Sequence, residues 1–341
     1  MKVITSRNVN DALIKGLVAL EKEGIDRDSR NGPVRVFSGP VTTCYEKPKE
    51  RVIFFPERDA NPYFHFMESL WMLAGRNDVA FISQFSSNIV NFSDDGETFH
   101  GGYGARWRNW FVESNEGDLQ YGEHFIDQIE LIANLLITNP DDRRIVLQMW
   151  SVQDDLGMVG KDFPCNLMAT FRINPIGELD MTVFNRSNDM IWGAYGANAV
   201  HFSMLQEFMA ACVNCPVGKY WQVSTNFHSY HNTLEKHGSV RSHPTGQDPY
   251  SLGEVVPFPL INGSTTQEWM ADLDMFLSQG VWALGYTDSF FRKVAVPMLA
   301  SWRYWKDRRS PRHKDDALYW ARQIRAQDWS RACVEWLERR K

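Results

Sequence analysis

The sequence has little cysteine and no long hydrophobic run. Five cysteines in 341 residues are too few, and odd in number, for a disulfide framework, which favours the reducing interior of a cell. No stretch approaches the ~18 consecutive apolar residues of a membrane-spanning helix, and residues 1–22 lack the apolar core of a signal peptide. We therefore expect a cytoplasmic protein that makes no membrane contact.

Glycine and proline are not abundant either, and the net charge is modest. The 23 Gly and 15 Pro exclude a collagen-like or low-complexity chain, and a hydrophobic fraction of 43% excludes an intrinsically disordered one. The net charge of −6 is unevenly distributed, because residues 301–341 hold 12 Lys+Arg against 6 Asp+Glu and the first 300 residues carry −12. The basic end predicts a surface unlike the rest.

Hydrophobic patterning divides the chain near residue 240. Before it, segments with helical spacing alternate with strand-like runs, which predicts an α+β fold. The expected helices cover residues 9–23, 62–73, 124–136 and 200–211, and the expected strands cover 34–37, 51–55, 144–150, 167–173, 179–184 and 220–226. The later segments are mainly helical. We expect a body over residues 1–240 and a basic, mainly helical C-terminal extension over 241–341.

One cysteine is distinguished by its surroundings. Cys165 follows Pro164 directly before a predicted strand, and Arg143, Arg144 and Arg186 flank it in the sequence. A thiolate is the best protein nucleophile near neutral pH, and nearby arginines lower the pKa of a thiol. Paired arginines also suit a phosphate group. Taken alone, a single cysteine is more often a core residue, so this pattern needs support from the rest of the chain.

That support comes from six short motifs in a fixed order. They are Glu68–Gly75, Tyr103–Trp110, Asp127–Ile129, Asn139–Arg144, Pro164–Cys165 and Arg186–Asp189, followed by Gly193 and Asn198. Over about residues 26–231 the chain thereby resembles the thymidylate synthase superfamily, which includes thymidylate synthases and bacteriophage and antibiotic-pathway pyrimidine-nucleotide hydroxymethylases. The resemblance implies an α+β fold with a mixed β-sheet body and packed helices.

The resemblance also implies a one-carbon transfer with named catalytic residues. Cys165 would add to C6 of a pyrimidine nucleotide, and C5 would then attack the one-carbon unit of 5,10-methylenetetrahydrofolate. Arg186 would hold the phosphate and favour the Cys165 thiolate. Glu68 would transfer protons and order water, which requires a raised pKa. Tyr103 would relay the C5 proton.

Further residues would bind the two substrates. The resemblance and the residue types together give, for the nucleotide, Arg30, Arg143, Arg144, Arg186, Ser187, Asn198, Asn226 and His228. Of these, Arg143 and Arg144 would reach the phosphate of the neighbouring subunit, which implies a homodimer. For the folate, Asp189 would hold the pterin, and Trp71 and Phe92 would pack near the ligands, although core packing is an equal alternative for both aromatic residues.

Departures from thymidylate synthase favour water as a reactant. Asn166 follows the nucleophile where thymidylate synthases have His, and Asn188 stands where they have Cys. Their short apolar tail, which closes over the folate, is replaced by Trp336–Lys341. After tetrahydrofolate leaves, hydride would give a methyl group and water a hydroxymethyl group, and excluding water favours the first outcome. We therefore expect a nucleotide hydroxymethylase, with thymidylate synthase (reductive methylation of dUMP) as the alternative.

The choice of nucleotide rests on few residues. The Asn198 amide suits the N3–H and O4 of uracil, whereas a carboxylate there would favour cytosine. The segment from Gly193 to Asn198 is one residue longer than the family spacing, so the position of this amide is open. Asn226 and His228 stand where the family uses His and Tyr on the ribose hydroxyl, which leaves a ribonucleotide open. The sequence slightly favours dUMP over dCMP or CMP.

Two readings from other classes compete with this one. Cys212/Cys215 and His228/His231 have spacings that occur in zinc sites, but a single pair of cysteines is a weak signal and we predict no metal. The basic extension contains several tryptophans and could bind nucleic acid. Because these tryptophans recur at helical spacing, we favour packing in a docked helical cap or dimer contact over nucleic-acid binding.

Overall fold

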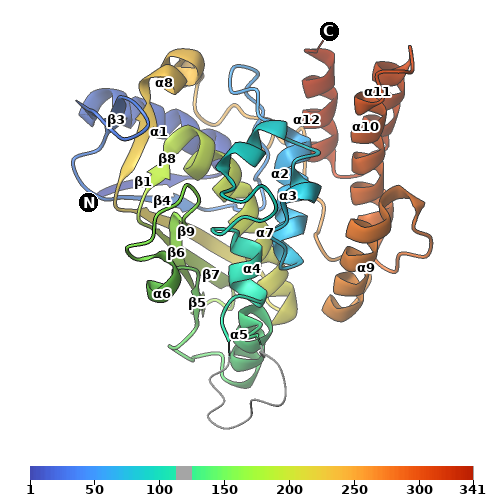
Figure 1. Cartoon of the computed structure of the whole chain (residues 1–341), viewed down its shortest axis with the longest axis horizontal. Helices are drawn as coiled ribbons and strands as arrows, with labels where there is room; N and C mark the ends of the chain where they lie inside the picture. Colours follow the sequence, from blue (N-terminus) through green and yellow to red (C-terminus); the bar gives the residue numbers. More distant parts are fainter. Residues whose placement is uncertain (113–124, 341) are drawn as a thin grey trace.

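A six-stranded mixed β-sheet forms the centre of the fold in the computed structural model, which describes residues 1–112 and 125–340 (Figure 1). Across the sheet the strands are β1 (Lys2–Ser6), β4 (Val41–Tyr45), β9 (Val217–Ser224), β7 (Leu179–Asn185), β6 (Asn166–Ile173) and β5 (Val146–Gln148). The pairs β1–β4 and β7–β9 are parallel and the others antiparallel. The α+β prediction is confirmed.

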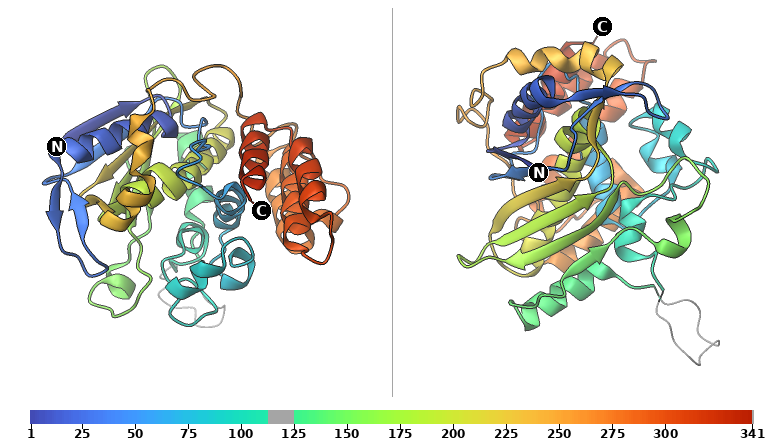
Figure 2. Two further views of the ribbon diagram at one scale, coloured as in Figure 1. Left: turned by 90° about the horizontal axis from the view of Figure 1, so that it is seen from above. Right: turned by 90° about the vertical axis from the view of Figure 1, so that its left-hand side faces the viewer.

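One face of this sheet is covered by helices and the other is not. Along β7, Leu179, Met181 and Val183 are fully buried, whereas the alternate residues Thr182 and Phe184 are partly exposed, as expected for a strand with one covered face. The covering helices are α1 (Val9–Glu23) and α7 (Asn198–Cys212), and α2 (Pro62–Leu73) packs against α7. In the right-hand view of Figure 2 the strands lie toward the viewer and the helices behind them.

A second, four-stranded sheet brings distant polar residues together. Its order is β2 (Ile25–Arg27), β3 (Val34–Val36), β10 (Phe227–Tyr230) and β8 (Asn188–Asp189). The strands β8 and β10 are parallel, and their register sets Asp189 opposite His228. Two of the polar positions predicted to bind different substrates are therefore neighbours.

Most predicted elements are confirmed. Further helices and helical turns, most of them short, lie outside the elements already named. These are α3 (Val79–Ile82), η1 (Ser87–Phe92), α4 (Tyr103–Arg108), α5 (Gln128–Thr138), α6 (Val152–Asp155), η2 (Met190–Ala197), α8 (His231–His237), η3 (Gly238–Ser242) and η4 (Gly280–Trp282). The helix expected over residues 124–136 begins at Gln128; its predicted first residue lies outside the described residues.

The strand predicted over residues 51–55 is wrong. The segment is buried and extended but joins no sheet. Side chains satisfy its backbone instead: Asn10 Nδ2 donates to the Val52 carbonyl, the Phe54 N–H donates to Asn10 Oδ1, and the Val52 N–H donates to the Tyr250 hydroxyl. Its apolar run therefore reflects burial between helices, which a strand-like pattern does not distinguish from pairing.

The C-terminal extension packs against α2. It contains α9 (Thr266–Gln279), η5 (Phe291–Ala295), α10 (Val296–Lys306), α11 (His313–Gln323) and α12 (Gln327–Glu338), drawn beside α2 in Figure 1. On α2, the ring centroid of Tyr63 lies 5.1 Å from that of Trp302 and 5.6 Å from that of Trp336. The ring centroid of Phe66 lies 5.2 Å from that of Trp329. All three tryptophans are buried, which confirms the packing interpretation for them. The boundary at residue 240 stays a prediction.

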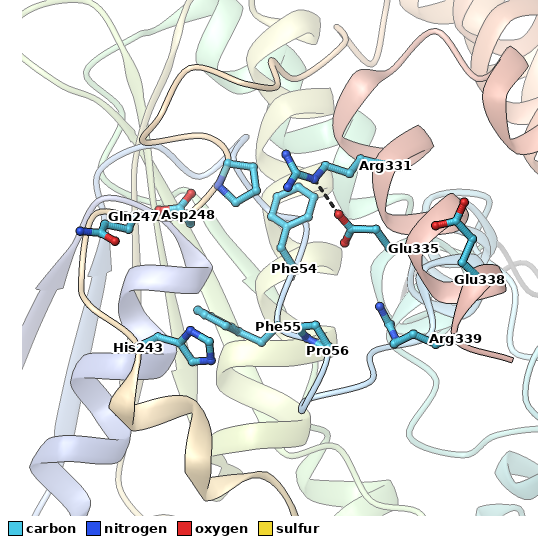
Figure 3. A pocket seen from close by; sticks show the side chains of 11 residues that line it. Phe54, Phe55, Pro56, His243, Gln247, Asp248, Arg331, Glu335, Glu338 and Arg339 are labelled. Atoms are coloured by element: carbon cyan, nitrogen blue, oxygen red, sulfur yellow. Dashed lines mark hydrogen bonds and ion pairs between the residues drawn. The ribbon is translucent and has the colours of Figure 1, made fainter.

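A cavity of about 550 Å³ lies where the extension meets the body (Figure 3). Phe54 and Phe55 form part of its wall opposite α12. The charged groups along it are paired within the protein: Arg331 with Glu335, Arg339 with Asp59, and His243 with Glu57. No unpaired charge among these groups indicates a ligand, and we assign none. None of the described helices has the length and apolar composition to span a membrane.

Candidate active site

The predicted nucleophile is held by the predicted proton relay. Cys165 is partly buried and lies directly before β6, and Tyr103 is the first residue of α4. The backbone N–H groups of Cys165 and Asn166 donate to the Tyr103 hydroxyl over 3.1 and 3.2 Å. Burial raises the pKa of Tyr103 well above its usual value, so this hydroxyl accepts two hydrogen bonds while keeping its own proton to donate. The structure thus brings these two residues together.

Arg186 supports the Cys165 loop from the other side. Its Nε donates to the Pro164 carbonyl over 2.9 Å, and its Nη2 donates to the Phe163 carbonyl over 3.2 Å. Burial raises the pKa of the Cys165 thiol. The Arg186 charge lowers this pKa as expected, but burial raises it by more, so the net shift is upward.

Asp189 and Arg58 place opposite charges in one buried region. Asp189 Oδ1 accepts from the N–H groups of Ile191 and Trp192. Its Oδ2 is buried without a hydrogen-bond partner among the described residues, and so are both Nη atoms of Arg58. Arg58 donates from Nε to the Ile191 carbonyl over 3.1 Å and lies over the Trp192 ring at 4.1 Å. Burial raises the pKa of Asp189 and lowers the pKa of Arg58 to about 10.

Arg58 was not predicted from the sequence. It sits in a polar turn, Pro56–Asp59, which is typical of an exposed charge cluster. Only the packing shows that its side chain is 1% exposed. Unpartnered polar atoms at this depth are rare in folded proteins and indicate a site for a polar ligand.

Asn198 occupies the position predicted to read the base, but its amide is partly committed. It begins α7, directly after the π-helical segment η2, which is kinked at Tyr195 and Gly196. A π turn accommodates an extra residue, which explains the longer spacing before Asn198. Asn198 Nδ2 donates to Asn188 Oδ1 over 3.2 Å, so its Oδ1 is the atom available to accept from a base.

His228, a predicted nucleotide-binding residue, lies on β10 beside Tyr230, a candidate that the sequence analysis did not name. The two alternate residues share one side of β10, with ring centroids 5.4 Å apart. Asn226 precedes the strand, is exposed, and contributes its backbone carbonyl to the Asn188 N–H over 2.9 Å. The His-x-Tyr spacing within a strand was the signal that identifies Tyr230.

The structure places the three remaining candidates, Glu68, Phe92 and Trp71, in different environments. Glu68 is buried on α2, with its Oε2 2.9 Å from Nε2 of His201. Phe92 is 62% exposed at the end of η1, where a ligand can reach it. Trp71 is a correction: it is 2% exposed, its Nε1 donates to Asp78 over 3.1 Å, and its ring packs on Phe99, so it belongs to the core.

The predicted phosphate-binding residues lie at the surface of the single chain. Arg30 is exposed in the turn between β2 and β3, and Ser187 is partly exposed beside Arg186. Arg143 and Arg144 are exposed before β5, and Arg144 pairs with Asp142 through bonds of 3.0 and 2.6 Å. Among the described residues, none of these three arginines has a hydrogen bond to the Cys165 loop.

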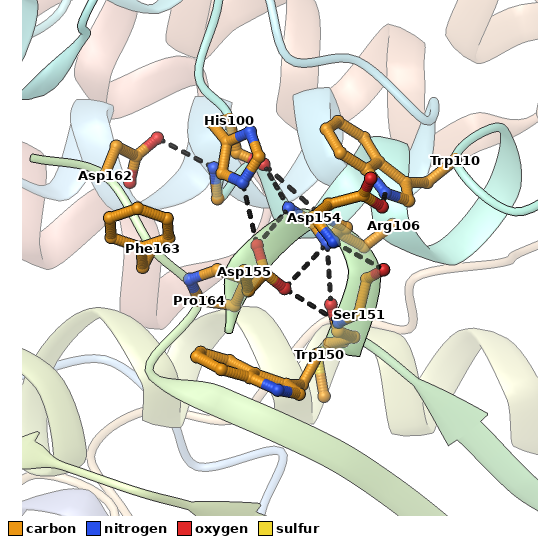
Figure 4. A network of polar contacts seen from close by, with 12 residues as sticks. His100, Arg106, Trp110, Trp150, Ser151, Asp154, Asp155, Asp162, Phe163 and Pro164 are labelled. Carbon is orange, nitrogen blue, oxygen red and sulfur yellow. Dashed lines mark hydrogen bonds and ion pairs between the residues drawn. The ribbon is translucent and has the colours of Figure 1, made fainter. Parts of the chain in front are cut away.

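A buried ionic network supports the segment at the start of α4 that carries Tyr103 (Figure 4). Arg106 and Asp155 have fully buried side chains and form two parallel bonds of 3.0 and 2.9 Å. Asp155 also contacts His100 Nε2 at 2.7 Å and accepts from the Ser151 N–H over 2.7 Å. The Arg106 guanidinium donates to the His100 carbonyl over 2.9 Å and lies 3.7 Å from the Trp110 ring centre. These contacts fix residues 100–106 against residues 149–155.

Neither competing reading is supported by the described residues. The part of the chain that the structure describes has no group of three or more His, Cys, Asp or Glu placed to hold a metal ion. The thiols of Cys212 and Cys215 are free. Trp302, Trp305 and Trp336 pack in the interior rather than forming an exposed stacking surface.

The mixed sheet places Cys165 at the start of an inner strand, between the Tyr103 hydroxyl and Arg186, and the family match below identifies the class as a one-carbon transferase. Residues 20–249 match the family model described as thymidylate synthase. The chain belongs to the thymidylate synthase family.

Three relatives refine this comparison, and all are named deoxyuridylate hydroxymethyltransferase. The protein of Pseudomonas phage M6 is 50% identical over 348 aligned positions, which cover 100% of this chain and 95% of the relative. The protein of Bacillus phage SP01 is 38% identical and is matched over 56% of this chain and 49% of its own length. The protein of Delftia phage PhiW-14 is 28% identical, with 67% and 62% covered. The C-terminal extension therefore has a counterpart in the first relative.

Proposed function

We propose that the chain transfers a one-carbon unit from 5,10-methylenetetrahydrofolate to C5 of dUMP, with water completing a hydroxymethyl group. The observation that carries this proposal is the 50% identity, over the whole chain and its extension, to a protein named deoxyuridylate hydroxymethyltransferase. The geometry supports it, because Cys165, Tyr103 and Arg186 form one hydrogen-bonded unit.

The roles of the residues follow from their positions. The Cys165 thiolate adds to C6 and leaves again at the end. Tyr103, which keeps its proton while accepting from the Cys165 loop, transfers the proton of C5. Asn198 accepts from the base through Oδ1, and His228 with Tyr230 contacts the sugar. Arg186 and Ser187, with Arg30, bind the phosphate.

The folate side of the site fits a large polar ligand. The folate supplies the carbon that becomes attached to C5. Asp189 Oδ2, buried and unpartnered, accepts from the N–H groups of a pterin, and the two unpartnered Nη atoms of Arg58 offer donors to an anionic or carbonyl oxygen beside it. Phe92 offers an exposed aromatic face at the mouth of the site.

Two features support water as the final reactant. The residue after the nucleophile is Asn166, whose buried amide has no hydrogen-bond partner among the described residues and can therefore bind a water. Arg339 and Arg340, among the last described residues, pair with Asp59 on the body, and Arg340 lies 3.4 Å from the Trp336 ring centre. This segment is tied down by charges and does not form an apolar cover that excludes water.

Product analysis tests the reaction. Wild-type protein with methylenetetrahydrofolate is offered dUMP, dCMP, UMP and CMP separately, and each product is weighed by mass spectrometry, with Cys165→Ala as the inactive control. We expect dUMP to gain the mass of a formaldehyde unit, without dihydrofolate. A methylated nucleotide with stoichiometric dihydrofolate would show a thymidylate synthase instead.

A homodimer completes the proposal. The uncovered sheet face, with Phe184, Trp221 and Val223 only partly exposed, offers a surface for a second copy. The exposed Arg143 and Arg144 of that copy then reach the phosphate. Co-expressing Cys165→Ala with an Arg143→Ala/Arg144→Ala double variant tests this, because each is inactive alone and a mixed dimer has one intact site. Absent recovery, with monomeric elution, would contradict it.

A further inference from the structure

Glu68 has a buried histidine beside it that no predicted role uses. His201 lies on α7 and is 3% exposed, and its Nε2 is 2.9 Å from Glu68 Oε2 on α2. Despite this short distance, neither atom has an aligned hydrogen bond to another described residue. The next residue on α7, Phe202, packs on Tyr103 with ring centroids 6.0 Å apart. The helix that carries His201 therefore contacts, one position later, the residue that holds the nucleophile loop.

Burying the His201 ring among apolar residues costs free energy unless its ring nitrogens have hydrogen-bond partners. The residues around it on α7 are almost all buried and mostly apolar. His65, one turn before Glu68, is also buried, and burial together with the charges of Arg58 and His201 lowers its pKa well below the usual value. A buried polar atom is nearly always hydrogen-bonded. Glu68 Oε2 and His201 Nε2 are in contact but not aligned for a hydrogen bond, so a water beside them that both donates and accepts would satisfy the pair.

We propose that His201 is a positioning residue for the water that completes the hydroxymethyl group, acting through Glu68. This inference rests on the proposed function. In the step concerned, the water oxygen bonds to the methylene carbon on C5, and the electron pair of the methylene double bond moves through C5 toward O4. The water proton passes to the Glu68–His201 pair. The electron pair then returns to form the C5–C6 double bond, and Cys165 leaves as a thiolate.

Two rates, tritium release and product formation, distinguish a positioning role of His201 from a purely structural one. Under single-turnover conditions with nucleotide tritiated at C5, tritium release reports every step up to loss of the C5 proton, and product formation also includes addition of water. We expect His201→Leu to slow hydroxymethyl formation by about 100-fold, the range of a lost proton-transfer partner, while tritium release changes by less than about threefold. His201→Gln, which keeps a donor and an acceptor, should recover part of the product rate.

Chemical trapping and a matched control complete the test. When water addition is slow, added 2-mercaptoethanol should capture the methylene on C5 as a thioether in His201→Leu. Ser203→Ala, a buried change on the same helix whose hydroxyl bonds only to the Val200 carbonyl, should leave both rates unchanged. Equal losses of tritium release and product in both His201 variants, or no loss in either, would overturn the inference. Failure of the proposed function looks different, because wild-type protein would then form a methylated product.

Discussion

The Arg106–Asp155 pair gives the strongest quantitative prediction from the structure. Asp155→Asn keeps the shape of the side chain but removes the charge that faces a guanidinium with no solvent exposure. The other acceptors of Arg106 are neutral carbonyls of His100 and Met149. An asparagine also turns one N–H₂ toward groups that already donate. Breaking one partner of a buried ion pair costs about 3–5 kcal/mol, so we expect the free energy of unfolding to fall by that amount.

The control is an ion pair at the surface that has one hydrogen bond where Arg106–Asp155 has two, and whose arginine also pairs with Glu254. Arg331 and Glu335 lie one helical turn apart, 2.8 Å from each other, with side chains 37% and 33% exposed. Glu335→Gln should lower the free energy of unfolding by less than about 1 kcal/mol, because solvent screens the pair. Urea denaturation followed by circular dichroism measures both losses. If the two losses were equal, burial would not control the strength of the Arg106–Asp155 interaction and the reasoning would fail.

A double variant separates the unpaired charge from the loss of contacts. In Arg106→Met with Asp155→Leu, both charges are replaced by apolar groups, so nothing is left unpaired. We expect it to be more stable than Asp155→Asn alone. A double variant less stable than the single one would show that the hydrogen bonds to His100 and Ser151, rather than charge pairing, dominate.

Two of the three further predictions concern the nucleophile and its surroundings, and the third concerns a buried carboxyl group of α12. Gly104→Ala would place a Cβ 2.6 Å from the Met72 carbonyl oxygen, a backbone atom that cannot easily move; we expect a stability loss of about 1–3 kcal/mol and reduced activity, measured by denaturation and product formation. Because burial raises the pKa of the Cys165 thiol, its alkylation by iodoacetamide should have a midpoint at higher pH than that of an exposed cysteine in a short peptide, and Arg186→Gln should raise it further; a midpoint below that of the peptide would contradict this. Burial raises the pKa of Asp328 to about 6, so the folded state keeps a proton that the unfolded state loses, and stability falls as pH rises from about 4 to 6, by about 3 kcal/mol. Asp328→Asn should remove that part of the pH dependence of urea unfolding.

The nucleophile region could be predicted because its chemistry requires particular residues in a particular order. Cys165, Tyr103 and Arg186 lie far apart in the sequence, yet their ordered motifs placed them in one site, and the structure joins them. Arg58 and His201 were missed for opposite reasons. Arg58 lies in a polar turn whose sequence predicts an exposed side chain. His201 lies in an apolar helix whose sequence predicts a core residue. Exposure and partners in three dimensions decide both cases.

Helical spacing also fails to separate a ligand contact from a core contact. Trp71 is one turn after Glu68 on α2, so a sequence pattern places both on related faces of that helix. The structure shows that the indole is satisfied by Asp78 and packed on Phe99, whereas the carboxylate keeps an unpartnered oxygen. The difference comes from the neighbouring elements rather than from the helix. The sequence of α2 alone therefore cannot show which of Trp71 and Glu68 contacts a ligand and which belongs to the core.

The extension influences the folate side through one short segment. Arg339 and Arg340 pair with Asp59, the residue next to Arg58, whose guanidinium lies against Trp192 near Asp189. The same α12 packs Trp336 against Tyr63, five residues before Glu68 on α2. A shift of α12 would therefore act on the proposed folate-binding residues and on the helix that carries Glu68 together. The packing of Trp336 on Tyr63 is the stronger of the two connections, because solvent screens the exposed pairs of Arg339 and Arg340 with Asp59.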